Sequence, residues 1–134
     1  MLLVADWDSA AHIVEPKVHA AGIKTDAPWL LNYVKDGIRD NKFFLFMDTS
    51  GSDSFVVLST DTCPYRGVRT LFVLLAYCAN GDAHKLYGDE IDQLAREADC
   101  TEIEFISSRV GWQKAAKKYG YVPVDVTYRK RLNG

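Results

Sequence analysis

Three short apolar runs in the middle of the chain have the length and composition of β-strands. They span Lys42–Thr49, Ser54–Thr60 and Thr70–Cys78, and turns rich in Gly, Ser, Asp and Pro separate them. The third run is apolar almost throughout, which is typical of a central strand covered on both faces. Because short turns join the three runs, the pattern predicts an antiparallel meander.

Two amphipathic helices are predicted before these strands. The first spans about Ser9–Gly22, with Ser9 as its cap, and Pro16 predicts either a start near that residue or a kink. Thr25 or Asp26 can cap the second helix, with Pro28 in its first turn. The apolar stripe of the second helix consists of Leu30, Leu31, Val34 and Ile38.

In the last third of the chain, segments with the hydrophobic period of a helix alternate with segments that have the period of a strand. The predicted elements are a helix at His84–Asp99, a strand at Thr101–Ser107, a short helix at Gly111–Tyr119 and a last strand at Val122–Leu132. A right-handed crossover makes the strand at Thr101–Ser107 parallel to that at Thr70–Cys78. The sequence therefore predicts one α/β domain over residues 1–134, of order α-α-β-β-β-α-β-α-β. Its sheet is mixed and mostly antiparallel, with helices on both faces.

Charge is distributed unevenly along the chain. The net charge is −2, but seven basic residues and one acid from Arg109 onward give that part +6 and leave −8 for the rest. The basic end could be a solvated face, could dock on an acidic protein, or could bind nucleic acid. The negative remainder opposes attraction to nucleic acid, so a nucleic-acid partner is not expected.

Other features narrow the class of protein. A content of 48% hydrophobic and 25% charged residues in 134 residues is ordinary for one globular domain. No apolar run is long enough to insert in a membrane, and the N-terminus lacks the basic and apolar regions of a signal peptide. The cysteines, Cys63, Cys78 and Cys100, have no CxxC spacing and are expected to be reduced. No metal site is expected, because the three histidines are not grouped with other ligands.

The C-terminal third resembles a known family. The string Leu94–Ser108 followed by Trp112–Tyr121, with the order of elements, is similar to the GNAT (Gcn5-related N-acetyltransferase) family over most of the chain. More narrowly, the chain resembles small GNAT-like proteins of tailed bacteriophages, some of which are internal virion proteins. The residues that carry this second resemblance are Ala95–Arg96, Asp99–Cys100, Ile103–Glu104 and Arg109–Trp112.

The family resemblance implies an acetyl-CoA site between the strands on either side of the long helix. The residues that it would assign to the cofactor are Tyr77, Asn80, Gly81, Ala83, His84, Lys85 and Arg109. Family members hold the pyrophosphate with a glycine-rich turn after the central strand. Here that turn has one glycine, and Asp82 adds a negative charge, so the expected cofactor is none, or acetyl-CoA if the chain is an enzyme.

The resemblance also implies catalytic groups, and these depart from the family. Ala116 stands where family members often have an acidic tyrosine, and the strand Thr70–Cys78 carries no carboxylate. The remaining weak candidates are Tyr119 as an acid and Glu104 as a base.

Two functions are therefore carried forward, and whether the chain is an enzyme is left open. The preferred hypothesis is a non-catalytic phage protein of GNAT fold that acts in the virion, or as an accessory component, through protein contacts. Its partner would be another protein such as a virion component, and its location the host cytoplasm or the phage particle. The alternative is an acetyl-CoA-dependent N-acetyltransferase with a degenerate pyrophosphate turn.

Overall fold

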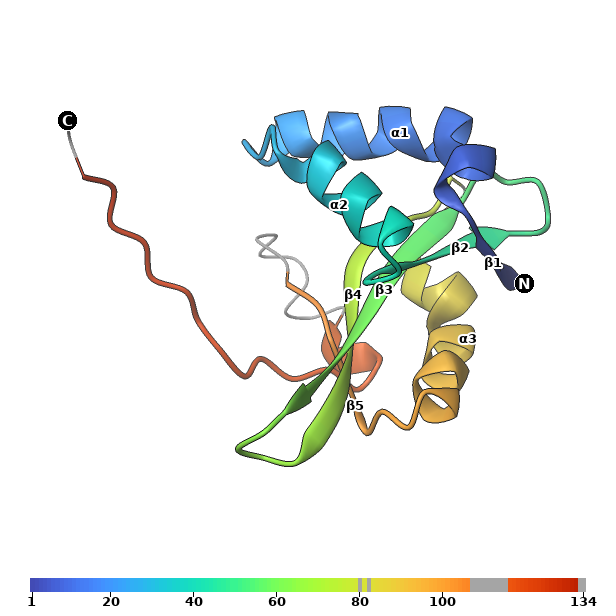
Figure 1. The fold of residues 1–134 in the computed structure, drawn as a ribbon. Helices are drawn as coiled ribbons and strands as arrows, with labels where there is room; N and C mark the ends of the chain where they lie inside the picture. The colour runs from blue at the N-terminus through green and yellow to red at the C-terminus, as the bar shows by residue number, and fades with distance from the viewer. Residues whose placement is uncertain (80, 82, 107–115, 133–134) are drawn as a thin grey trace.

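Five strands form one mixed sheet whose spatial order follows the chain, β1-β2-β3-β4-β5, in the computed structural model (Figure 1). The structure describes residues 1–79, 81, 83–106 and 116–132. The elements are β1 Leu2–Ala5, α1 Trp7–Lys24, α2 Leu30–Arg39, β2 Phe44–Asp48, β3 Phe55–Cys63, β4 Val68–Tyr77, α3 Ala83–Glu97 and β5 Glu102–Glu104. The first four strands pair antiparallel, and β5 runs parallel to β4. The predicted α/β class, the meander and the parallel crossover are confirmed.

Helices cover both faces of the sheet. Helices α1 and α2 lie together on one face and α3 lies on the other (Figure 1). The core under α1 and α2 includes Val14, Val18 and Phe55, and the core under α3 includes Leu58 and Ile91. Burial of both helix stripes against the sheet supplies the main apolar driving force for this arrangement.

Strand β4 changes the face to which its side chains point. Val57 pairs with Leu75 and Leu58 with Val73, so Leu74 is an extra residue, a β-bulge, in β4. Before the bulge Leu71 and Val73 pack under α3, and after it Leu75 and Tyr77 pack under α1 and α2. Both faces are apolar, which explains why this run shows no alternation in the sequence.

Helix α1 begins earlier and ends later than expected. Its N-cap is Asp6, whose Oδ1 accepts from the Ser9 N–H at 2.8 Å, so the prediction of Ser9 as the cap was wrong. The helix continues through Pro16 and past Gly22. An internal proline costs a helix about 3 kcal/mol. Here Pro16 faces solvent and the buried stripe on the opposite side holds the two halves together.

The predicted caps of α2 were also wrong. Thr25 instead ends α1, because its N–H and Oγ1 both donate to the carbonyl of Ala21. Asp26 has a φ of +56°, which is not a capping conformation. Pro28 therefore lies in the connection, and the helix starts at Leu30 without a side-chain cap.

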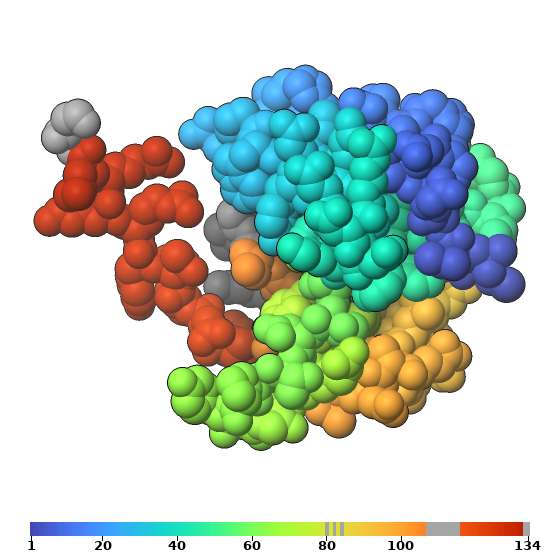
Figure 2. Space-filling model, in the orientation of Figure 1, coloured from blue at the N-terminus to red at the C-terminus, as the bar shows by residue number. Residues whose placement is uncertain are grey.

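The ends of the chain differ most from the prediction. Strand β1 was not predicted, and β5 is shorter than the expected Thr101–Ser107. Of the helix expected at Gly111–Tyr119, only residues from 116 are described, and residues 116–118 are helical. The strand expected at Val122–Leu132 is absent from the described fold, and this segment projects from the body of the molecule (Figures 1 and 2). Alternation specifies an extended chain but not the neighbouring strand with which it would pair.

Two further expectations can be compared with the described residues. None of the helices described is both long and apolar enough to cross a bilayer. The three cysteines are free thiols, and Cys100 is buried.

Two helical glycines make a matched test of the packing. The Phe43 ring lies directly over Gly37, where an added Cβ would come within 2.1 Å of Phe43 Cδ2, whereas nothing lies within 4 Å of a Cβ at Gly88. Gly37→Ala should lower the free energy of unfolding by about 1 to 3 kcal/mol through overpacking. Gly88→Ala should raise it by about 0.5 to 1 kcal/mol through helix propensity. Urea unfolding measures both, and equal changes for the two variants would contradict the close contact.

Candidate functional site

All three residues of β5 pair with β4, but they pair only with the first half of that longer strand. The parallel ladder consists of Thr70↔Glu102, Leu71↔Ile103 and Phe72↔Glu104. Strand β4 runs on to Tyr77, whereas β5 ends at Glu104. Among the described residues, the β4 stretch 73–77 therefore has no strand beside it on that edge. Its backbone N–H and C=O groups on that side can hydrogen-bond to an extended ligand as they would to another strand.

The bulge lies within the stretch of β4 that follows the last pair with β5. Leu74 lies two residues after Phe72, the last β4 residue that pairs with β5. It also interrupts the regular ladder between β3 and β4. Bulges bend a strand and are frequent beside active sites, because they redirect backbone groups. The end of the ladder and the bulge together make this stretch of β4 the most irregular part of the sheet.

The turn after β4 leads into the N-terminus of α3. Gly81 has a φ of +136°, a conformation that residues with a Cβ rarely adopt. Helix α3 starts at Ala83, and Lys85 is exposed in its first turn. The first turn of this 15-residue helix contains no acidic residue and presents backbone N–H groups that have no partner within the helix. Such an end is suited to a phosphate.

The predicted cofactor residues are described to different extents. Tyr77, Gly81, Ala83 and Lys85 follow one another from the end of β4 into α3. His84 belongs to the first turn of α3, but its side chain lies outside the described part of the structure. Asn80, Asp82 and Arg109 also lie outside the described residues.

A hydrogen-bond network fixes this turn to the sheet. The Ala79 N–H donates to Oγ of the buried Ser54 at 2.9 Å, and Ser52 Oγ donates to Ser54 Oγ at 3.0 Å. Tyr87 of α3 donates its hydroxyl to Asp48 Oδ2 at the end of β2. The two sides of the turn are thus held by adjacent parts of one network.

The network shifts two ionisation equilibria. The hydrogen bonds from Tyr87 and from the Ser50 N–H hold the pKa of Asp48 well below its ordinary value. Burial, and secondarily the hydrogen bond to Asp48, raises the pKa of Tyr87. At neutral pH the pair is therefore a neutral phenol bound to a carboxylate.

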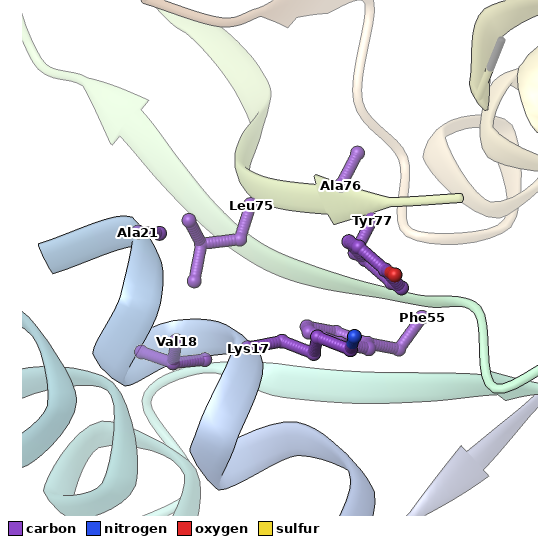
Figure 3. Close-up of a pocket in the computed structure, with 7 residues that line it drawn as sticks. All are labelled: Lys17, Val18, Ala21, Phe55, Leu75, Ala76 and Tyr77. Atoms are coloured by element: carbon purple, nitrogen blue, oxygen red, sulfur yellow. The ribbon is translucent and has the colours of Figure 1, made fainter. Parts of the chain in front are cut away.

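The other face of the same β4 stretch borders a small cavity. The cavity has a volume of about 180 Å³ and lies between α1 and the ends of β3 and β4 (Figure 3). Its lining residues are Lys17, Val18, Ala21, Phe55, Leu75, Ala76 and Tyr77. Tyr77 stacks on Phe55 with ring centroids 5.7 Å apart, and Lys17 Nζ lies 4.8 Å from the centre of the Tyr77 ring. A cavity of this size can admit a small group but not a nucleotide.

The two candidate catalytic residues lie on different segments. Glu104 stands opposite Phe72 at the last paired position of the ladder. Ile103 packs into the core under α3, so by alternation Glu104 points toward the α1 side of the sheet. Tyr119 follows the helical residues 116–118, is half-buried, and has Lys118 Nζ 5.9 Å from its ring centre.

The residues of the polar network were not predicted as part of the site. Tyr87 has the spacing of a core residue, and Asp48 and Ser54 flank an ordinary turn. No local pattern identifies them, because they are 39 and 33 positions from Tyr87 in the sequence. No group of three potential metal ligands occurs among the described side chains.

Solved structures share this fold. No protein-family model and no curated protein matches the sequence. The chain is similar to ribosomal-protein-alanine N-acetyltransferase from Brucella melitensis biovar Abortus 2308, with a TM-score of 0.70, 17% identity, and coverage of 98% of this chain and 99% of that one. A Trypanosoma brucei acetyltransferase has a TM-score of 0.66 and 16% identity, with coverage of 98% and 99%. A Clostridium acetobutylicum structure described as a predicted acetyltransferase with acetyl-CoA has a TM-score of 0.68 and 15% identity, with coverage of 98% and 95%.

These similarities establish the GNAT fold for this chain. Since the identities are below 20%, they concern the arrangement of helices and strands. They support the predicted fold and not the narrower resemblance to phage proteins. One of the three structures contains acetyl-CoA, so the expectation that no cofactor is involved has no support.

The Tyr87–Asp48 bond predicts a stability effect that depends on pH. Tyr87→Phe should lower the free energy of unfolding by about 1.5 to 3 kcal/mol at pH 7, because it removes a hydrogen bond to a charged group. The folded-state pKa of Asp48 is depressed, so its stabilisation is complete above about pH 4, the unfolded value. As the pH falls below that value, the unfolded chain takes up the proton first and the stabilisation declines.

Urea unfolding at pH 7 and pH 3 measures this effect. The difference between the wild type and Asp48→Asn should shrink at the lower pH. Tyr65→Phe is the control, because Tyr65 is 96% exposed. A difference for Asp48→Asn that grows on acidification would disprove the depressed pKa.

Proposed function

We propose that this protein binds acetyl-coenzyme A where β4 and β5 part and transfers the acetyl group to an amine. The observation that carries the proposal is the end of the β4–β5 ladder at Phe72↔Glu104, while β4 continues to Tyr77. An extended pantetheine arm carries amide groups that can pair with the β4 edge as a peptide strand would. The fold similarity to acetyltransferases supports the same conclusion.

The described residues suit such a donor. The phosphates would lie at the first turn of α3, with the N–H groups near Ala83 and the ammonium of Lys85 as donors. The single glycine of the turn, Gly81, adopts the conformation that needs a glycine. A glycine-poor turn therefore does not exclude diphosphate binding.

The transfer itself requires a free amine and a leaving thiolate. The amine nitrogen forms a bond to the thioester carbonyl carbon, the carbon–sulfur bond breaks, and the thiolate of coenzyme A departs and is protonated. Glu104 can accept the proton that the acceptor's ammonium group must lose before its nitrogen attacks, because Glu104 lies at the end of the β4–β5 ladder. Most of the rate would come from holding the two reactants together.

The acceptor amine would approach from the α1 side. Glu104 points to that side, and the cavity under Lys17 and Tyr77 opens beside the same stretch of β4 (Figure 3). The aromatic pair Phe55–Tyr77 can pack against an apolar part of the acceptor, and Lys17 can bind an anionic group.

The findings favour this alternative over the non-catalytic phage protein that the sequence favoured. The sequence argument depended on departures at three positions, whereas the described β4–β5 ladder ends at Phe72↔Glu104 and the first turn of α3 contains no acidic residue, and both features support the alternative. No observation on the described residues points to a virion component.

A charge reversal tests the position of the phosphates. Lys85→Glu should weaken acetyl-CoA binding at least about tenfold, because it replaces an ammonium that donates hydrogen bonds to the phosphates with a carboxylate that repels them. Lys24→Glu at the end of α1 makes the same change in net charge and should leave the affinity within about twofold. Gly81→Trp should abolish binding through its positive φ. Isothermal titration measures all three, and a wild type that binds no acetyl-CoA at about 1 mM would refute the proposal.

Removal of the carboxylate tests the proposed base. Glu104→Gln should lower kcat by about 10²-fold or more with an active amine, while the affinity for acetyl-CoA stays unchanged. Glu102→Gln is the matched control, because Glu102 already binds Arg66 and faces the paired part of the sheet. Release of the coenzyme A thiol reports turnover. Equal rates for wild type and Glu104→Gln would exclude this residue as the base.

A further inference from the structure

A strip of apolar side chains follows the side of β4 that faces α1. The residues on either side of Phe72 pack under α3, so by alternation Phe72 points to the opposite side of the sheet, where α1 and α2 lie. Because of the bulge, Leu74 and Leu75 both contact the core on that side. Tyr77 follows, and Figure 3 shows Leu75 and Tyr77 pointing toward α1. All four side chains are only partly buried, so the strip keeps apolar surface that a ligand can cover.

The two ends of this apolar strip carry opposite charges. Glu104 stands opposite Phe72 in the ladder and points to the same side of the sheet. At the other end, Lys17 Nζ lies 4.8 Å from the centre of the Tyr77 ring. The ion pairs among the described residues involve neither Glu104 nor Lys17, and of the described residues that line the cavity none is acidic. Both charges are therefore available to a ligand.

The length of the strip sets the distance between the two charges. A strand rises about 3.3 Å per residue, so along β4 Leu75 lies roughly 10 Å and Tyr77 roughly 16 Å from Phe72. A single α-amino acid is too short to reach from Glu104 to Lys17. An extended chain of about three to five residues spans the distance, at about 3.3 to 3.6 Å per residue.

We infer that the acceptor is an elongated amine that carries a carboxylate roughly 10 to 16 Å from its nitrogen, with an apolar part between them. The amine lies at Glu104, the apolar part covers the strip, and the carboxylate pairs with the Lys17 ammonium. An amine with a second positive charge at that distance is rejected, because Lys17 repels it. This inference rests on the proposed acetyl transfer and specifies the class of amine that the transfer uses.

Matched peptides test the charge and the spacing. The probes are the tetrapeptide alanine-leucine-alanine-leucine with a free carboxylate, the same tetrapeptide as its C-terminal amide, and the dipeptide alanine-leucine with a free carboxylate. With acetyl-CoA as the donor, release of the coenzyme A thiol gives kcat/KM for each probe. The wild type should prefer the tetrapeptide acid at least about tenfold over both other probes.

Charge reversal tests the contribution of Lys17. Lys17→Glu should reduce the preference for the tetrapeptide acid over its amide at least about tenfold. Lys24→Glu makes the same change in net charge in the last turn of the same helix and should keep the preference. Both lysines are exposed, so both variants should fold. Equal rates of the wild type with the acid and the amide, or a loss of the preference in both variants, overturns the inference.

Binding in the absence of acetyl-CoA separates this inference from the proposed function. Isothermal titration should show that the wild type binds the tetrapeptide acid at least about tenfold more tightly than the amide, and that Lys17→Glu does not. If this preference is found but acetyl-CoA neither binds nor reacts, the proposed function fails and the site for an anionic amine stands. If the acid and the amide are acetylated equally well, the proposed function stands and this inference fails. A wild type that neither binds nor acetylates the tetrapeptide acid also overturns the inference.

Discussion

The hydrogen bonds among Asp48, Ser54 and Tyr87 set the geometry on which the candidate site depends. Asp48 ends β2, Ser54 precedes β3, and Tyr87 belongs to the second turn of α3. Through Ala79 the same network reaches the end of β4, and the Leu2 N–H donates to Glu90 one turn further along α3. The N-terminus of the helix is thus placed against the sheet before any ligand arrives. A site organised in advance loses less entropy on binding than one that must be ordered.

The bulge at Leu74 connects this placement to the parted strands. It lets one strand fill the core under α3 with its first half and the core under α1 with its second half. The second half can then contribute to two surfaces at once, with its edge toward the parting from β5 and its face toward the cavity under Lys17. A regular strand would present only one type of side chain to each face along its whole length. The irregularity therefore brings the proposed donor site and the proposed acceptor cavity to the same five residues.

Local patterns predict most of the fold and little of the site. The meander, the long helix at α3 and its parallel crossover follow from periodicity and turn residues, because these depend on nearby sequence. The errors have a common cause. Asp6 caps α1 and Thr25 ends it through contacts that compete with equally good local alternatives, and β1 is a strand only because β2 lies beside it. The Asp48–Tyr87 bond and the end of the β4–β5 ladder depend on residues that are distant in sequence, so no spacing reveals them. The turn at Gly81 shows a different kind of error. The number of glycines in the turn indicated that it could not hold a diphosphate, but the conformation of its one described glycine carries more information than that number.

The small number of acidic and basic side chains near the candidate site is compatible with catalysis of acetyl transfer. A thioester is an activated acyl donor, and a thiol ionises at about pH 8.5, so the thiolate can leave without prior protonation and an acid at the position of Ala116 is not essential to the chemistry. What remains necessary is removal of a proton from the ammonium and alignment of nitrogen with the carbonyl carbon. Alignment alone can lower the activation free energy by about 7 to 11 kcal/mol. A general base raises the rate by about 10²- to 10⁴-fold, which corresponds to about 3 to 5 kcal/mol. In the proposed reaction, binding of the donor along the β4 edge and at the first turn of α3 would supply the larger of these two effects, and the Glu104 carboxylate would supply the smaller.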